Sequence, residues 1–249
     1  MSVRAAQVTA TVSERHRLSP HLLRLTLTGP ELADLGTTGL PDEWVGLIVP
    51  GQFQSRYYTV RRWEEGALLL DVVVHEQGLV ADWATGDPVG DVVTLTEPKG
   101  SFLPPADAGW LLLVGDLTAL PAMARIAETN AARGEAALPC RIVAEVPEPV
   151  SDYLPESAAE VAWHTASAED APDGQEAEAG SRLAEITAAL DWPAGPGYFW
   201  MAGESAQMRT IRKHLMHERR LPTTHYDVMG YWRRVARRQP RAVDRRENP

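Results

Sequence analysis

The sequence predicts two domains, a β domain over residues 1–106 followed by an α/β domain over residues 107–249. Short segments in the first hundred residues alternate apolar and polar side chains between glycine- and proline-containing turns, which is typical of a β-barrel or β-sandwich. After Pro104-Pro105 the chain changes to continuous apolar runs that alternate with helical segments, which indicates a parallel sheet. The 249 residues, of which 44% are hydrophobic, are enough for two buried cores.

The β domain is predicted to contain five strands and one short helix. Residues 23–28 alternate strictly between apolar and polar side chains and therefore predict a half-buried strand. The other predicted strands cover residues 5–12, 55–61, 67–74 and 91–96, and one or two helical turns are predicted at 78–85.

In the α/β domain the apolar run 110–114 predicts a strand that is buried on both faces. A helix is predicted at 118–132, with Pro121 near its start, where proline is tolerated. Further strands are predicted at 140–146, 161–164, 198–202 and 227–231, and further helices at 183–190 and 207–219. The segment 167–180 is rich in Glu, Asp, Ala and Gly and predicts a surface loop.

Composition excludes several classes of protein. The net charge of −10 argues against nucleic-acid binding, which depends on a positive field. The single cysteine, Cys140, rules out an intramolecular disulfide and a cysteine-based metal centre, and we expect no metal site. Without a signal-peptide pattern or an apolar run that could span a bilayer, we expect a cytoplasmic protein with no stable membrane insertion. The arginine-rich tail 233–246 predicts a solvated terminal segment, with contact to an anionic partner as the alternative.

Some familiar catalytic motifs are missing. The dinucleotide fingerprint G-x-G-x-x-G is absent, although the loop 115–121 joins a buried strand to a helix start, where backbone N–H groups favour phosphate. The segment 203–205 lacks the second glycine of the hydrolase motif G-x-S-x-G. His214 and His217 do not form H-E-x-x-H. Hydrolase and metalloprotease functions are therefore disfavoured.

The segment 54–61 is the strongest candidate for a binding site. Arg56 is a permanent cation with the geometry to bind a diphosphate, and Tyr58 offers a flat surface on which an aromatic ring stacks. Strand alternation places these two side chains on one face, and the Thr59 hydroxyl is able to reach a ring nitrogen if the strand twists or ends there. A charged edge strand with cross-strand aromatic pairs is the alternative interpretation.

Several segments together resemble a known family. Arg56-x-Tyr58-Thr59 resembles the R-x-Y-[ST] flavin motif of the ferredoxin-reductase superfamily. The segments 75–84, 97–102, 115–122, 202–204 (with Arg209 and Arg212 after it) and 230–233 resemble segments of siderophore-interacting proteins, which are FAD-dependent ferric-siderophore reductases. The chain departs from this pattern at Leu117, where glutamate is usual, and at Glu97 and Val235, where glycine is usual or common.

The resemblance implies an N-terminal antiparallel β-barrel that binds FAD and a parallel-sheet α/β domain that binds NADPH or NADH. Electrons would pass from the nicotinamide through the flavin, which carries the chemistry, to ferric iron in a siderophore, with release of Fe(II). The residues expected to bind the cofactors are Arg56, Tyr57, Tyr58, Thr59, Val60, Arg61, Val74, His75, Gly78, Leu79, Val80, Trp83, Thr118, Ala119, Gly203, Glu204, Tyr231 and Trp232. The basic residues expected to attract the ferric siderophore are Lys99, Arg62 and Arg233.

Three questions stay open at this point. The choice between NADH and NADPH is one. Glu145, at the end of a predicted strand, suits acceptance from ribose hydroxyls and repulsion of a 2′-phosphate, but Arg141 on the same strand argues against this, and an exposed solvated glutamate is the alternative interpretation. The alternative functions are another NAD(P)H:flavin oxidoreductase of the superfamily, or a non-catalytic flavin- or siderophore-binding protein. The third question is the oligomeric state, for which a monomer is expected.

Overall fold

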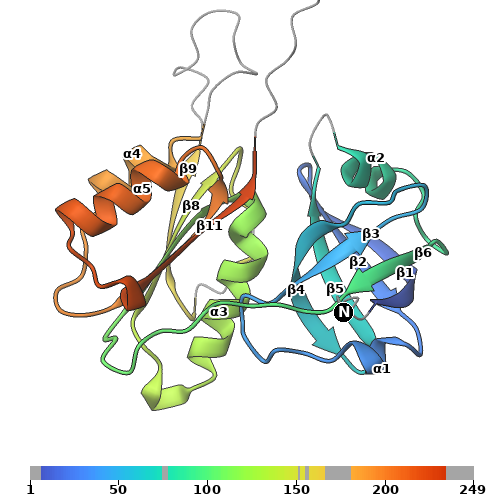
Figure 1. Ribbon diagram of the computed structural model, residues 1–249, viewed down its shortest axis with the longest axis horizontal. Helices are drawn as coiled ribbons and strands as arrows, with labels where there is room; N and C mark the ends of the chain where they lie inside the picture. Colours follow the sequence, from blue (N-terminus) through green and yellow to red (C-terminus); the bar gives the residue numbers. More distant parts are fainter. Residues whose placement is uncertain (1–6, 75–77, 151, 155–156, 166–180, 234–249) are drawn as a thin grey trace, which may run out of the picture.

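The computed structural model describes residues 7–74, 78–150, 152–154, 157–165 and 181–233, and it confirms the predicted fold class (Figure 1). Six antiparallel strands close into a barrel, not a sandwich, in the order β1-β2-β5-β4-β3-β6. These strands are β1 (Gln7–Ser19), β2 (Leu22–Thr28), β3 (Trp44–Ile48), β4 (Arg56–Glu64), β5 (Ala67–Val73) and β6 (Val92–Thr96). The short helices α1 (Leu32–Leu35) and α2 (Leu79–Thr85) belong to the same part of the chain.

Strand β3 is the one barrel strand that the sequence analysis did not predict. Its residues form an apolar run interrupted by Gly46, so the period-2 alternation of apolar and polar side chains is missing. The structure explains this glycine, because a Cβ atom there would lie 2.6 Å from the Thr96 hydroxyl on β6. The Gly46 N–H instead donates a hydrogen bond to that hydroxyl at 2.9 Å.

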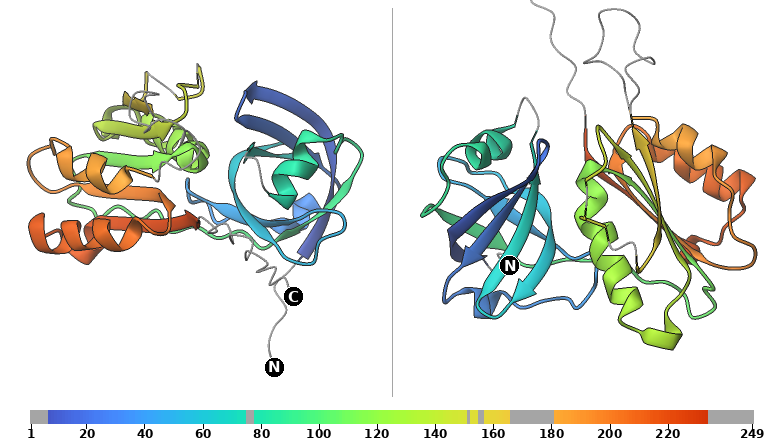
Figure 2. Two further views of the ribbon diagram at one scale, coloured as in Figure 1. Left: turned by 90° about the horizontal axis from the view of Figure 1, so that it is seen from above. Right: turned by 180° about the vertical axis from the view of Figure 1, so that it is seen from behind.

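The second half of the chain forms a five-stranded parallel sheet in the order β11-β10-β7-β8-β9. Its strands are β7 (Leu111–Asp116), β8 (Cys140–Val146), β9 (Glu160–Thr165), β10 (Tyr198–Glu204) and β11 (Tyr226–Trp232). The helices are α3 (Leu120–Ala131), α4 (Leu183–Ala189) and α5 (Met208–Lys213). Figures 1 and 2 show α3 between the sheet and the barrel, with α4 and α5 on the other face of the sheet.

Two predicted helices differ from the structure at one end. The helix predicted at 118–132 begins as a 3₁₀ turn at Leu117–Ala119 before α3, and the helix predicted at 207–219 ends as a π-type turn at His214–Glu218. The predicted loop 167–180 and the tail beyond residue 233 lie outside the described residues. Within the described residues no helix is both long and apolar enough to cross a membrane.

Strand β7 shows why its run of apolar residues predicts a parallel sheet. Leu111 and Leu113 pack in the core on the α3 side, whereas Leu112 and Val114 pack in the core on the α4 and α5 side. All four side chains are 2% exposed or less, as expected for a strand covered on both faces.

Helix α3 is held against the barrel by two ion pairs of opposite polarity, one to β4 and one to the residue before β3. The Arg61 guanidinium of β4 donates to both carboxylate oxygens of Glu128 on α3, at 2.5 and 2.8 Å. In the other direction Arg125 on α3 lies 3.4 Å from the Glu43 carboxylate beside β3, and it donates to the Val60 carbonyl at 2.8 Å. Each domain contributes one acid and one base, so a sliding movement of α3 along β4 would break both pairs.

Glu43 is the most strongly bound carboxylate at this interface. Its side chain is fully buried and accepts hydrogen bonds from the Trp63 indole at 2.8 Å, from the Thr37 hydroxyl, and from the backbone and hydroxyl of Thr38. Burial raises the pKa of Glu43, but the bonds from Trp63, Thr38 and Thr37 outweigh burial and bring the pKa below its ordinary value of 4.5. Glu43 is therefore a buried carboxylate that stays charged.

The substitution Glu43→Gln is expected to lower the free energy of unfolding by about 2–4 kcal/mol. It leaves Arg125 without its charge partner, and it places the glutamine NH2 group among N–H and O–H donors that now bond the carboxylate. Urea denaturation at pH 7 measures this. The matched control is Glu64→Gln, since Glu64 is exposed and lies 3.7 Å from Arg62. That control is expected to stay within about 0.5 kcal/mol of the wild type.

The lowered pKa of Glu43 also predicts a pH dependence. A carboxylate whose pKa is lower in the folded than in the unfolded chain adds stability above its ordinary pKa of 4.5, and this contribution is lost as the pH falls through the folded value. Between about pH 5 and about pH 3 the wild type is therefore expected to lose more stability than Glu43→Gln. Parallel urea titrations at several pH values test this, and equal losses would contradict the ionised state of Glu43.

Candidate functional site

Strand β4 carries the three side chains on which the predicted flavin contact depends. Arg56 is exposed, and its guanidinium lies near the Gln54 side chain at 3.5 Å and the Ser55 carbonyl at 3.3 Å. Burial raises the pKa of Tyr58 to about 12, against a smaller opposing effect of the Arg56 charge. Thr59 is only 6% exposed. In the described part of the chain no carboxylate forms an ion pair with Arg56, so its charge is open to an anionic ligand.

The other predicted residues of this strand differ in how exposed their side chains are and in the bonds they already make. Tyr57 is 65% exposed. The Val60 side chain lies inside the barrel core, so a ligand is left with its backbone, whose carbonyl already accepts from Arg125. The Arg61 guanidinium forms an ion pair with Glu128 across the interface. A cofactor role for Val60 and Arg61 stays a prediction.

The predicted second flavin segment surrounds the start of α2. Gly78 precedes the helix in an extended conformation, and Leu79 is 64% exposed. Val80 is buried in the barrel core, and Val74 and Trp83 pack against that core, with the Trp83 indole donating to Asp91 at 2.7 Å. His75 lies outside the described residues.

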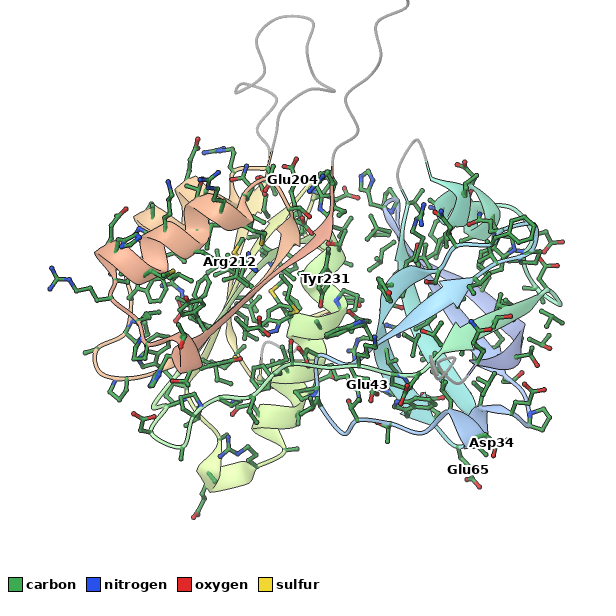
Figure 3. All side chains as sticks on the ribbon, in the orientation of Figure 1. Asp34, Glu43, Glu65, Glu204, Arg212 and Tyr231 are labelled. Carbon is green, nitrogen blue, oxygen red and sulfur yellow. The ribbon has the colours of Figure 1, made fainter. Side chains whose placement is uncertain are left out.

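Two buried hydroxyls lie on strands of different domains, one on β4 of the barrel and one on β11 of the parallel sheet. The Thr59 hydroxyl on β4 and the Tyr231 hydroxyl on β11 are both shielded from solvent, and neither has a hydrogen-bond partner among the described residues. Figure 3 shows Tyr231 on the side of β11 that faces the barrel. Unsatisfied buried polar atoms are uncommon, and here they indicate a place for a polar group of a ligand. Together with the open charge of Arg56, this pair fits a ligand that combines a diphosphate with a hydrogen-bonding ring, as FAD does.

Asp116 connects two of the segments on which the family resemblance depends, 115–122 and 230–233. At the end of β7 its carboxylate accepts from the Thr118 backbone at 2.9 Å, from the Thr118 hydroxyl at 2.5 Å and from the Trp232 indole at 2.6 Å. Burial raises the pKa of Asp116, the bonds from Thr118 and Trp232 lower it, and the charge of Glu145 raises it, with a net upward direction. The side chain therefore holds the last strand of the sheet to the start of α3.

Glycines allow these strand ends to pack closely. A Cβ atom at Gly115 would lie 2.4 Å from the Cβ atom of Ala119 and 2.8 Å from the Ala202 carbonyl. A Cβ atom at Gly203 would lie 2.8 Å from Asp116 Oδ2, and one at Gly230 would lie 2.4 Å from a side-chain oxygen on the loop after β10. The glycines of the three motifs are thus required by the packing of the sheet edge itself.

Two glutamates lie at the same carboxyl edge of the sheet. Glu204, at the end of β10, is 5% exposed and accepts from the Ser181 backbone at 3.3 Å (Figure 3). Glu145, at the end of β8, accepts from the Ser181 hydroxyl and the Arg182 backbone, both at 2.7 Å. These bonds attach the start of α4 to the sheet edge. The suggested contact of Glu145 with a ribose remains a prediction, and its carboxylate already has two donors.

Leu117 marks the departure from the family pattern next to Asp116. Its side chain is 7% exposed and belongs to the core on the α3 side of the sheet. An apolar residue suits this position, because burying a carboxylate there would cost its hydration unless a partner bonded it.

The three basic residues predicted to attract the substrate come from three places. Lys99 forms an isolated backbone bridge with Trp44, the residue that pairs with Thr59 across β3 and β4. Arg62 is exposed on β4, and Arg233 follows β11. Their role in attracting a substrate stays a prediction.

A cavity of about 400 Å³ lies between the barrel and the α/β domain. Its lining residues are Leu18, Arg24, Arg61, Arg62, Glu128, Val150, Asp152 and Tyr153. Arg24 forms two bonds of 2.8 Å with Asp71, which also accepts from the Tyr153 hydroxyl at 2.5 Å. Since Arg24 and Arg61 are paired with carboxylates, the cavity offers little free positive charge.

Sequence reasoning missed Glu43, Asp71, Glu128 and Tyr153, which hold the two domains together. One signal was present, because Asp71 is a charged residue within the apolar strand 67–73. A buried charge of this kind requires a partner, although the sequence does not say which one.

Comparison with known proteins agrees with this architecture. A family model described as "Siderophore-interacting protein" matches residues 108–235, and one described as "Siderophore-interacting FAD-binding domain" matches residues 11–56 and 51–102. An uncharacterized protein of Mycobacterium tuberculosis is 26% identical over 264 residues, covering 94% of this chain and 92% of that protein. The NADPH-dependent ferric-chelate reductase of Escherichia coli is 26% identical over 173 residues, covering 66% of this chain and 60% of that protein.

Solved structures share the whole arrangement. The siderophore-interacting protein SipS from Aeromonas hydrophila is 26% identical, with a TM-score of 0.72 and 92% of each chain covered. A ferredoxin NADP+ reductase from Neisseria gonorrhoeae has a TM-score of 0.68 over 92% of this chain and 100% of that chain. At 18% identity, the latter likeness concerns the fold alone.

The packing of the sheet edge predicts the effect of Gly115→Ala. The added methyl group meets the Ala202 carbonyl, a backbone atom that moves only with β10, so the free energy of unfolding is expected to fall by about 2 kcal/mol or more. The control is Gly109→Ala, where the nearest atom, the Pro196 carbonyl, is 3.4 Å away. Urea denaturation of both variants checks this, and equal stabilities would show that the edge adapts.

Proposed function

The chain belongs to the siderophore-interacting protein family, and from this premise we propose that it is an FAD-dependent reductase of ferric siderophores. NADH or NADPH supplies the electrons, and iron leaves the siderophore as Fe(II). The observation that carries the proposal is strand β4, which joins an unpaired guanidinium at Arg56 to a buried, unpartnered hydroxyl at Thr59. The strand lies at the junction of the two domains, where an electron carrier has to sit.

Each residue of this strand has a part in the proposed FAD site. The Arg56 guanidinium binds the diphosphate through charge-assisted hydrogen bonds. The Tyr58 ring packs against the flavin, and the Thr59 hydroxyl bonds a ring nitrogen. FAD supplies the redox chemistry, since it accepts two electrons from a nicotinamide and releases them singly. The start of α2, with Gly78 before it, offers backbone N–H groups to the diphosphate.

The nicotinamide is proposed to bind at the carboxyl edge of the parallel sheet. Thr118 and Ala119 form the 3₁₀ turn after β7, and Gly203 and Glu204 end β10. Ligands of open parallel sheets bind at such an edge. Tyr231 and Trp232 on β11 lie on the side of this edge next to the barrel, so they connect the nicotinamide side with the flavin side.

The ion pairs between α3 and β4 fix the relation between these two sites. Both the Arg61–Glu128 pair and the Arg125–Glu43 pair would be lost if the domains moved apart. Hydride transfer requires the donor and acceptor atoms to be in contact, so a fixed domain arrangement favours it.

Ferric siderophore is the proposed substrate, and the protein does not need to ligate the iron. Hard oxygen ligands bind Fe(II) more weakly than Fe(III), so reduction by itself releases the metal. Lys99, Arg62 and Arg233 are proposed to offset the net charge of −10 near an anionic chelate. The proposed enzyme is a cytoplasmic monomer with a flavin-binding domain over 1–106 and a nicotinamide-binding domain over 107–249.

If Arg56 binds the diphosphate, Arg56→Ala is expected to raise the dissociation constant of FAD by about tenfold or more. Titration of FAD-free protein, followed by flavin fluorescence, measures this constant. Arg17→Ala serves as the control, because it removes another exposed arginine, on strand β1, whose guanidinium donates to the Pro20 carbonyl at 3.0 Å. Unchanged FAD affinity in Arg56→Ala would refute the diphosphate role.

The reaction is tested by anaerobic reduction of the FAD-loaded protein with NADH and NADPH in parallel. One of the two is expected to bleach the bound flavin, and a ferric catecholate or hydroxamate complex is then expected to restore its colour while an Fe(II) trap captures the iron. Protein that takes up no FAD contradicts the whole proposal. Protein that binds FAD but is bleached by neither nicotinamide favours the non-catalytic binding function.

A further inference from the structure

Glu145 lies at the end of β8, the second strand of the parallel sheet along the chain, on the carboxyl edge where the nicotinamide cofactor is proposed to bind. In dinucleotide-binding α/β folds, an acid in this region binds the ribose hydroxyls of NADH, and an arginine is needed for the 2′-phosphate that distinguishes NADPH. The charges around Glu145 therefore bear on which of the two cofactors the chain uses.

The Glu145 carboxylate is fixed in place and is still able to accept further bonds. Its Oε2 atom accepts from the Ser181 hydroxyl and its Oε1 atom from the Arg182 backbone N–H, both at 2.7 Å. A carboxylate offers about four lone-pair positions, so each oxygen keeps one for another donor. The side chain is only half-buried, which leaves it accessible to a ligand at the edge. A ribose hydroxyl is a donor of the required kind.

Arg141, the other charged residue of β8, lies too far away to neutralise Glu145. It occupies the amino end of the strand, where its guanidinium lies 3.4 Å from Glu160 and donates to the Asp191 carbonyl at 3.3 Å. Four residues of extended strand separate Arg141 from Glu145 by roughly 13 Å, which exceeds the screening length of about 8 Å at physiological ionic strength. The positive charge that argues against a ribose contact in the sequence thus belongs to the opposite edge of the sheet.

A second carboxylate adds negative charge beside Glu145. Ser181 donates through its hydroxyl to Glu145 at 2.7 Å and through its backbone N–H to Glu204 at 3.3 Å, so the two carboxylates meet at one residue. The guanidinium of Arg182, the next residue in the chain, lies 3.6 Å from the Glu185 carboxylate. Because that pair carries no net charge, it does not offset the two carboxylates at the edge.

We propose that this chain uses NADH and rejects NADPH, with Glu145 as the specificity-determining residue. Its carboxylate accepts from a ribose hydroxyl of NADH, and together with Glu204 it repels the 2′-phosphate of NADPH, which adds up to about two negative charges. This rests on the proposed function for the place of the nicotinamide site, and it deepens that function by naming the electron donor. The selection concerns binding alone, so no covalent bond forms or breaks in it.

The oxidised cofactors NAD+ and NADP+ test the preference without electron transfer, because they differ by the 2′-phosphate alone. Calorimetric titration of the full chain is expected to give a dissociation constant for NADP+ at least about tenfold that for NAD+. Anaerobic bleaching of bound flavin is expected to show the same preference for NADH in kcat/KM. The assays are run at pH 8, where a histidine is ordinarily uncharged, because His164 is the partner of Glu145 in the β8–β9 register.

The substitution Glu145→Gln keeps the shape of the side chain and one acceptor oxygen but removes the charge. It is expected to weaken the binding of NAD+ and to strengthen that of NADP+, so the ratio of the two dissociation constants falls by about tenfold or more. The matched control is Glu160→Gln, which removes one negative charge at the amino end of β9, on the opposite edge of the sheet. That control is expected to leave the ratio unchanged.

Two results would overturn the inference while the proposed function stands. One is wild-type protein that binds NADP+ as tightly as NAD+, or more tightly, and the other is an unchanged ratio in Glu145→Gln. Protein that takes up no FAD but shows the expected ratio would contradict the proposed function and support the inference. Protein that binds neither dinucleotide contradicts both.

Discussion

The contact between α3 and β4 is the constraint on which the rest of the molecule depends. Each domain places one acid and one base in this contact, and Glu43 and Arg61 are almost completely shielded from water. Buried ions are costly unless they are paired with good geometry, so the pairs specify one docking position more than they add stability. The strand held in this way is β4, and Thr59 lies two residues before Arg61. The position of the candidate flavin site relative to the parallel sheet therefore follows from the docking of α3.

The carboxyl edge of the sheet depends on a second set of contacts. Asp116 holds Trp232 and the turn after β7, and the glycines of three separate motifs let the strand ends approach. A motif that resembles a cofactor-binding signature can thus have its residues set by packing. In this protein the packing places the last residues of β11, among them Tyr231, on the side of the sheet next to the barrel.

The interior of the domain interface is polar, but its polar groups are nearly all satisfied. Arg24, Asp71 and Tyr153 form one network, and Asp42 accepts from the Ser101 backbone and hydroxyl. Against this background the Thr59 and Tyr231 hydroxyls, like Arg61 Nε, are buried polar atoms without a hydrogen-bond partner among the described residues. Together with the unpaired guanidinium of Arg56, they give β4 its capacity for a ligand.

The sequence by itself determined the order of the two domains and the strand that carries the candidate site. Alternating residues at 23–28 and the apolar run at 110–114 report local burial, which is a property of each segment alone. The barrel rather than a sandwich, the strand β3, and the partners of Glu43, Asp71 and Arg61 came only from the tertiary structure. The physical reason is that a charged residue within an apolar segment indicates that a partner is required, whereas the identity of that partner depends on docking between segments far apart in the chain. Arg61 illustrates this: its place beside Tyr58 and Thr59 suggested a flavin contact, but the approach of α3 pairs it with Glu128.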